Sequence, residues 1–182
     1  SATPERADDR QLADAFDEIV YRRDIESMIA DGYLCDLRAV QVKVNALLDR
    51  VHTVGGDLVA GELAEALAAA NAPGQAVAAW VEHARDRKTL VFTPTVALAE
   101  AMADKFRDAG VRAESLSGET PLDERRAILR RLSAGETQVV SNCAVLTEGF
   151  DEPTIDCIVV ARPTKSRPLY IQMIGRGTRI HP

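Results

Sequence analysis

Two arginines near the C-terminus are spaced so that both could bind one anion. They stand in the segment Gln172-Met173-Ile174-Gly175-Arg176-Gly177-Thr178-Arg179. If this segment is helical, Arg176 and Arg179 share a face, where planar guanidinium groups can bind phosphate oxygens and stabilise the charge that develops during phosphoryl transfer. The alternative is a basic helix end whose arginines are favoured by the helix dipole and solvated by water.

A second segment, residues 141–153, is harder to explain as a simple connection. It reads Ser141-Asn142-Cys143-Ala144-Val145-Leu146-Thr147-Glu148-Gly149-Phe150-Asp151-Glu152-Pro153. Gly149 permits a tight turn or the close approach of a ligand. Asp151 could accept hydrogen bonds from ribose hydroxyls or hold an arginine in place. The alternative is an Asp-x-Pro turn with a carboxylate on the surface.

Charge is distributed unevenly along the chain. The length of 182 residues and the hydrophobic content of 46% predict one substantial domain with an appendage. The net charge of the chain is -6. Residues 159–182 nevertheless contain five basic side chains and no acidic one: Arg162, Lys165, Arg167, Arg176 and Arg179. The local sign of the charge decides what a surface attracts, so this acidic protein can still present a phosphate-binding patch.

Cysteine and histidine usage points away from disulfides and metals. The three cysteines form no Cys-x-x-Cys pair, which favours reduced thiols in a cytoplasmic protein. The three histidines have no companions at metal-ligand spacing, so we predict no metal site formed by this chain. The sequence shows neither an apolar run of membrane-spanning length nor a signal peptide, and we expect no membrane partner.

From residue 88 onward the pattern alternates between short apolar strands and amphipathic helices. The predicted strands are 89–92, 111–116, 138–141 and 155–160, and the predicted helices are 95–109, 120–132 and one that starts near Ser166. This order predicts an α/β fold with three layers (α/β/α) and a mainly parallel sheet. Ligands of such sheets bind at the C-terminal ends of the strands, here at 93–95, 116–120, 141–153 and 161–166.

One of these loops, around Gly118, precedes a predicted helix whose free backbone N–H groups favour an anion. Thr120 would cap that helix, with Pro121 in its first turn. A capping role explains Thr120 as well as anion binding does.

The first 87 residues are predicted to form a separate, mostly helical segment. We expect a helix over 11–30, a half-buried strand over 37–44 and two further helices over 63–70 and 75–85. Trp80 is interpreted as core packing rather than base stacking, because no second aromatic residue accompanies it. The sequence assigns no function to residues 52–85.

Taken in order, these motifs resemble a known family. Residues 90–93, 117–125, 141–153 and 172–179 are similar to motifs IV, IVa, V and VI of the second RecA-like domain of superfamily 2 helicases. The resemblance covers about 88–179, and the predicted RecA-like domain spans 88–182, with its boundary after residue 87. The pattern is closer to DNA translocases related to repair helicases and restriction-enzyme motor subunits than to DEAD-box RNA helicases, because the latter begin motif VI with histidine where this chain has Gln172.

The resemblance implies a role for each matching residue. Arg176 and Arg179 would be arginine fingers that reach the γ-phosphate of ATP, and the residues that sense nucleotide or contact its ribose side would be Gln172, Gly149 and Asp151. The residues that touch the nucleic-acid backbone would be Thr93, Gly118, Ser141, Asn142 and Thr147. Such backbone contacts are insensitive to base sequence and depend strongly on salt.

Two motifs that ATP hydrolysis requires are missing from these residues. The chain contains no Gly-x-x-x-x-Gly-Lys-Ser/Thr segment and no Asp-Glu-x-His or Asp-Glu-Ala-Asp box. We therefore expect a first RecA-like domain, in the same protein or a partner, to hold most of the ATP and its Mg²⁺. The resulting hypothesis is the C-terminal motor half of an ATP-dependent helicase or translocase, with DNA favoured over RNA. The alternative is a non-catalytic helicase-like module that docks a protein partner.

This chain alone should hydrolyse ATP negligibly, because an arginine finger accelerates the transfer only of a phosphate that other groups hold in place. Steady-state phosphate release by the purified 182-residue chain checks this expectation, with Arg179→Ala as the control for contaminating ATPases. Turnover that disappears in the Arg179→Ala protein would contradict it.

Overall fold

A four-stranded sheet forms the centre of the molecule. The computed structural model describes residues 21, 23–147 and 151–181. The strands are β3 (Thr89–Thr93), β4 (Ala113–Leu116), β5 (Val139–Cys143) and β6 (Cys157–Val160). They pair in the order β4-β5-β3-β6, and every pairing is parallel. The predicted parallel sheet is confirmed.

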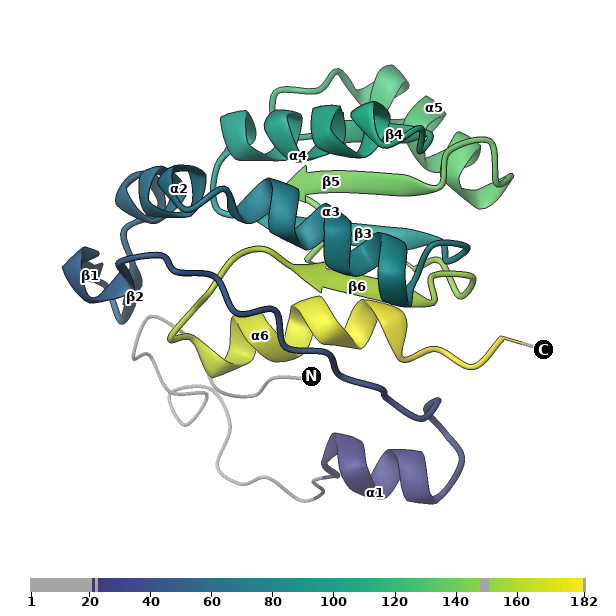
Figure 1. The fold of residues 1–182 in the computed structure, drawn as a ribbon. Coiled ribbons are helices and arrows are strands. Elements are labelled where there is room, and N and C mark those ends of the chain that lie inside the picture. Colours follow the sequence, from purple (N-terminus) through teal and green to yellow (C-terminus); the bar gives the residue numbers. More distant parts are fainter. Residues whose placement is uncertain (1–20, 22, 148–150, 182) are drawn as a thin grey trace.

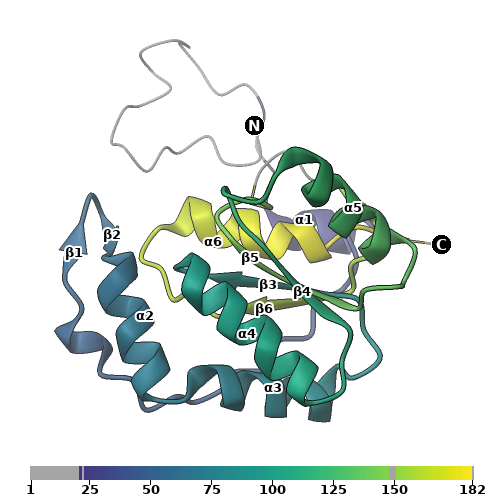
Figure 2. The same cartoon turned by 90° about the horizontal axis from the view of Figure 1, so that it is seen from above.

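Helices cover both faces of the sheet, as the alternating pattern predicts. Helices α3 (Ala72–His83) and α4 (Val96–Asp108) lie on one face. Helices α5 (Leu122–Ser133) and α6 (Arg167–Ile174) lie on the other, and Figure 2 shows the sheet between the two pairs. The fold is therefore the three-layer α/β/α arrangement.

Successive side chains of each strand supply the two hydrophobic cores. In β3, Leu90 and Phe92 are buried with α5 and α6, whereas Val91 is buried with α3 and α4. Strands buried on both faces are continuous apolar runs, which is why 89–92 could be recognised in the sequence.

Trp80 lies in the second of these cores. Its ring meets Phe106 edge to face, with centroids 5.2 Å apart, and its indole N–H donates to the Thr89 hydroxyl at 2.8 Å. The interpretation of Trp80 as core packing is confirmed. Helix α3, which precedes the boundary predicted at residue 88, therefore packs as part of the sheet domain.

Side-chain caps fix the starts of α4 and α6, two of the helices that cover the sheet. The Leu98 amide donates to the Thr95 hydroxyl at the start of α4, and the Leu169 amide donates to the Ser166 hydroxyl at the start of α6. The cap predicted at Thr120 is wrong. Helix α5 begins one residue later with Pro121 as its N-cap, and the Thr120 hydroxyl instead accepts from the Ser117 amide at 3.0 Å, which closes the preceding turn.

The N-terminal part contains short elements that sit beside the sheet domain. They are α1 (Ile25–Ala30), η2 (Leu48–Arg50), the antiparallel pair β1 (Thr53–Val54) and β2 (Asp57–Leu58), and α2 (Ala60–Ala69). Residues 25–30 of the predicted helix 11–30 are helical, and residues 11–20 lie outside the described part. In the described residues, no helix has the length and apolar character needed to cross a membrane.

The strand predicted over 37–44 is wrong. Residues 35–47 have no regular secondary structure. Val44 and Ala46 pack against the α2 core, whereas Leu37, Val40 and Val42 remain exposed. Only the C-terminal end of this segment is therefore in contact with an apolar core. An alternating pattern does not suffice to form a strand, because a strand also needs a neighbouring strand to pair with.

The segment after α6 packs tightly on β6. It forms η3 (Gly175–Gly177), and a Cβ atom at Gly177 would lie 2.7 Å from Ile158 Cγ1. At Gly175, no atom of the described residues would lie within 4 Å of a Cβ. Ile158 is β-branched and cannot easily yield.

Gly177→Ala should therefore lower the free energy of unfolding by about 1–3 kcal/mol, the usual cost of overpacking. Gly175→Ala is the matched control and should change it by less than about 0.5 kcal/mol. Urea unfolding followed by circular dichroism compares the two. Equal stability of both variants would show that η3 does not need a glycine against β6.

Candidate functional site

The two arginines approach one loop, although they do not share a helix face. Helix α6 ends at Ile174, Arg176 lies within η3, and Arg179 follows two residues after η3. Arg176 Nη2 donates to the Thr147 carbonyl at 2.6 Å. Arg179 Nε lies 3.2 Å from Asp151 Oδ1. Both side chains thus contact the loop between β5 and β6.

The Arg179–Asp151 ion pair lies at the surface. The side chains are 54% and 64% exposed, respectively. Exposed pairs of this kind contribute only about 0.2–1 kcal/mol, because water and salt screen them. Of the two predicted possibilities for Asp151, holding an arginine is the one seen here. Its predicted partner in contacting nucleotide, Gly149, lies outside the described residues.

Gln172 lies on α6, four residues before Arg176, and is partly buried. Its role in sensing nucleotide remains a prediction.

The C-terminal ends of β3 and β5 are joined by buried polar side chains. Asn142 donates through Nδ2 to the Val91 carbonyl at 2.9 Å and accepts at Oδ1 from the Leu146 amide at 3.3 Å. The Thr93 hydroxyl lies 3.1 Å from the carbonyl oxygens of both Thr95 and Asn142. These contacts fix the point at which the loop after β5 leaves the sheet.

Predicted nucleic-acid contacts fall into two groups by accessibility. Thr93, Ser141 and Asn142 are 1%, 0% and 0% exposed. Gly118 is exposed and Thr147 is partly exposed. Contact with a nucleic-acid backbone stays a prediction for all five. Of these five residues, only Gly118 and Thr147 have surface available for it in this structure, and the other three are buried.

The backbone reverses sharply just after β5. Ala144 has a φ of 54°, in the left-handed region that non-glycine residues seldom adopt. Such conformations persist where surrounding contacts enforce them, here next to the Asn142–Leu146 hydrogen bond. Burial raises the pKa of the neighbouring Cys143 thiol, an effect that Arg162 partly opposes. A raised pKa lowers the fraction of reactive thiolate, so this half-buried thiol is less nucleophilic than a free cysteine.

The basic loop between β6 and α6 is held by the β1–β2 hairpin. Asp57 accepts from the Thr164 hydroxyl and the Lys165 amide, both at 2.8 Å, and Lys165 Nζ donates to the Thr53 hydroxyl at 2.7 Å. Burial alone would raise the pKa of Asp57, but these hydrogen bonds outweigh it and the pKa lies below its ordinary value. Figure 1 shows the hairpin at the end of the sheet toward which the strands point.

Sequence reasoning missed this contact. More than 100 residues separate the hairpin from the loop, and no local pattern signals their pairing.

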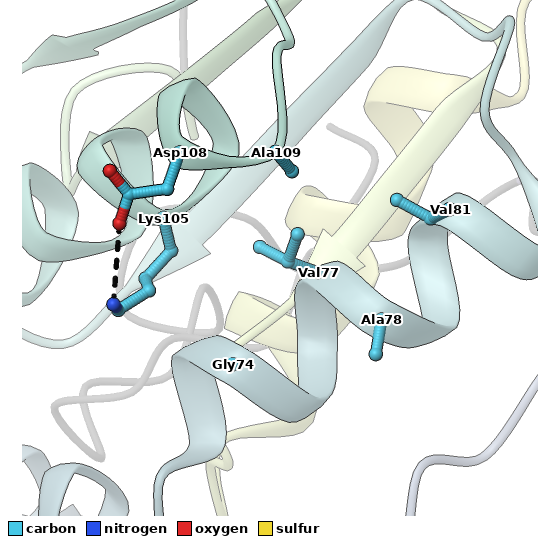
Figure 3. A pocket seen from close by; sticks show the side chains of 7 residues that line it. All are labelled: Gly74, Val77, Ala78, Val81, Lys105, Asp108 and Ala109. Atoms are coloured by element: carbon cyan, nitrogen blue, oxygen red, sulfur yellow. Dashed lines mark hydrogen bonds and ion pairs between the residues drawn. The ribbon is translucent and has the colours of Figure 1, made fainter.

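A shallow depression lies elsewhere, between α3 and α4. Figure 3 shows its lining, which comprises Gly74, Val77, Ala78, Val81, Lys105, Asp108 and Ala109, with Lys105 and Asp108 paired at its edge. It is on the face of the sheet opposite α6, and no predicted site residue lines it. Within the described ranges, no group of three or more His, Cys, Asp or Glu side chains is arranged to hold a metal ion.

Comparison with known proteins identifies the family. The model of the helicase conserved C-terminal domain matches residues 73–181. The chain therefore belongs to the helicase C-terminal domain family, the second RecA-like domain of ATP-dependent helicases of superfamily 2. The match begins at α3, in agreement with the packing of that helix on the sheet.

Two curated relatives align along the whole chain. A Saccharomyces cerevisiae protein described as an ATP-dependent helicase, IRC3, is 38% identical over 100% of this chain and 27% of its own length. A Schizosaccharomyces pombe protein described as a mitochondrial ATP-dependent helicase, irc3, is also 38% identical, over 100% of this chain and 30% of its own length. The chain thus spans less than a third of either relative.

A solved structure supports the fold. The DEAD box protein of the hyperthermophile Methanococcus jannaschii superposes with a TM-score of 0.54 at 21% identity, over 60% of this chain and 30% of that one. This likeness confirms the RecA-like architecture of the sheet and its helices.

The buried amide of Asn142 generates a stability prediction. Asn142→Ala leaves the Val91 carbonyl and the Leu146 amide without their partner, and each stranded group costs about 1–3 kcal/mol. The neighbouring Ser141 is equally buried, and in the described part of the chain its hydroxyl has no partner.

Ser141→Ala is therefore the matched control and should leave the free energy of unfolding unchanged or slightly higher. Urea unfolding of both variants is the measurement. A smaller loss of stability for Asn142→Ala than for Ser141→Ala would refute the assigned hydrogen bonds.

Proposed function

We propose that this chain is the C-terminal motor half of an ATP-dependent helicase or translocase, and that Arg176 and Arg179 act as its arginine fingers. The observation that carries the proposal is the convergence of both guanidinium groups on the loop after β5. Planar guanidinium groups stabilise the equatorial oxygens of a transferring phosphoryl group. Family membership supports the same assignment.

The site holds only part of what ATP hydrolysis needs. Arg176 and Arg179 supply positive charge, Asp151 pairs with Arg179, and Gln172 lies on the helix that leads into the arginine segment. With no phosphate loop in these residues, ATP and Mg²⁺ are held mainly by a first RecA-like domain, where the metal ion neutralises charge on the phosphates. The weak Arg179–Asp151 pair suits a finger that has to change partners when a phosphate arrives.

Nucleic acid is the proposed second ligand, with DNA favoured over RNA. The support for DNA is Gln172 at the position where DEAD-box RNA helicases carry histidine. The accessible loops at Gly118 and Thr147, together with the basic residues between β6 and α6, offer contacts to phosphates rather than to base edges. The cytoplasmic location predicted from the sequence is kept as a proposal, although the S. pombe relative is described as mitochondrial.

A non-catalytic module that docks a protein partner is the second candidate. The net charge of -6 favours it mildly, because an acidic surface disfavours nucleic acid. Both arginines of the motif are nevertheless present and directed at a common loop, which favours the catalytic role.

Arg179→Ala tests the catalytic role in the longer protein that contains both motor domains. The kcat for nucleic-acid-stimulated ATP hydrolysis should fall on the order of a thousandfold, the lower end of what arginine fingers supply. Nucleotide affinity should change much less, because the fingers meet charge that grows in the transition state. Arg176→Ala should behave in the same way, and Arg179→Lys should restore little, because a point charge does not reproduce a planar fork.

The matched control is Arg130→Ala, which removes an exposed arginine from α5 on the surface. The kcat of this variant should remain within twofold of the kcat of the unmodified protein. A twofold change corresponds to about 0.4 kcal/mol in the height of the activation barrier. If both motif variants stay folded and keep kcat within a few fold, the docking module becomes the better account.

A further inference from the structure

The extended N-terminal segment is fixed at both ends. Residues 35–47, here called the strap, run from the region of α1 to the β1–β2 hairpin in Figure 1. At the far end, Val44 and Ala46 pack against the core formed by α2. At the near end, Cys35 contacts the segment that carries the two arginines. Between these ends, Leu37, Val40 and Val42 are exposed.

The near-end contact is made with the backbone of the arginine segment. The Cys35 amide donates to the Thr178 carbonyl at 3.0 Å. Cys35 Sγ lies 3.5 Å from the Gly177 carbonyl oxygen, a weaker contact because a thiol is a poor donor. The two carbonyls that receive these contacts belong to consecutive residues, and they lie between Arg176 and Arg179 in the chain.

The arginine segment is therefore held from two sides. On one side Gly177 packs against Ile158 of β6, with no room for a Cβ atom. On the other side the strap holds Gly177 and Thr178 through Cys35. Within the segment, Thr178 is 2% exposed and its hydroxyl donates to the Gly175 carbonyl at 3.0 Å. Of these three supports, Ile158 belongs to the sheet and the Thr178 hydroxyl to the arginine segment, whereas Cys35 belongs to the strap.

We propose that Cys35 is a positioning residue, and that its backbone amide sets the orientation in which Arg176 and Arg179 are presented to nucleotide. This rests on the proposed function, in which both arginines act on ATP. Small displacements of positioned groups reduce catalysis severely, since an error of 1 Å can cost about a hundredfold in rate. The strap thereby makes the presentation of the fingers dependent on a segment 142 positions away in the sequence.

The contact itself can be tested in the unmodified chain. Amide hydrogen exchange measured by NMR should show the Cys35 amide exchanging at least tenfold more slowly than the Arg38 and Gln41 amides of the exposed strap. Equal exchange at these three positions overturns the proposal, whatever the activity of the longer protein.

Variants then separate the amide from the thiol. Cys35→Pro removes the N–H donor, and Cys35→Ala removes only the sulfur. Gln41→Pro is the matched control, because it places a proline on the same strap at an exposed residue. We expect Cys35→Pro alone to shift the backbone resonances of Gly177, Thr178 and Arg179, and all three variants to keep the circular dichroism of the fold.

The kinetic readout uses the longer protein with both motor domains. Cys35→Pro should lower kcat about tenfold to a hundredfold and leave the KM for ATP within about twofold, as expected when groups used in the transition state are misplaced. Cys35→Ala and Gln41→Pro should keep kcat within twofold. If Cys35→Pro lowers kcat only because part of the protein is unfolded, the resonances of Gly177, Thr178 and Arg179 will not shift selectively. That result would contradict the positioning role.

The two hypotheses fail in different ways. If Cys35→Pro shifts the resonances and kcat is unchanged while Arg179→Ala abolishes activity, the arginines are fingers and the strap does not position them. If neither Cys35→Pro nor Arg179→Ala changes kcat, the proposed function has failed and the positioning role fails with it.

Discussion

The contact between the arginine segment and the loop after β5 is the interaction on which the site depends. Arg176 is directed to the Thr147 carbonyl and Arg179 to the Asp151 carboxylate, so two segments about 30 positions apart in the sequence become one surface. The sheet makes this possible. Strands β5 and β6 flank β3 in parallel register, which brings the loop that leaves β5 alongside the helix that follows β6.

The supports of this surface differ in strength. Asn142 and Thr93 are buried and hydrogen bonded, and they fix the origin of the loop at the sheet. The Arg179–Asp151 pair is exposed and screened, so an anion can displace the carboxylate at little cost. A rigid base with an exchangeable ion pair at its edge suits the proposed role of Arg179 as a finger that responds to nucleotide. The residues predicted from the sequence differ in the same way. Thr93 and Asn142 are buried and fix the loop, whereas Gly118 and Thr147 keep exposed surface.

Much of the fold could be predicted from the sequence because its signals are local. Buried parallel strands such as 89–92 are continuous apolar runs, and Thr95 and Ser166 mark helix starts through their own side chains. The failures came where a local pattern had more than one physical outcome. The alternation over 37–44 is typical of a strand, but these residues pair with no strand in the part of the chain that the structure describes. Thr120 closes a turn instead of capping a helix. The contacts of Cys35 with Thr178 and of Asp57 with Lys165 span more than 100 positions, and only the folded chain brings them together.

The central claim is that Arg176 and Arg179 act together on a transferring phosphate. The most direct measurement is a structure of the longer protein, containing both motor domains and nucleic acid, with ADP and aluminium fluoride in place of the transition state. The account predicts that the guanidinium groups of both arginines lie within hydrogen-bond distance of the fluoride ligands and that Arg179 has left Asp151. A closed complex in which Arg179 still pairs with Asp151, and in which no arginine of this segment reaches the fluoride, would contradict it.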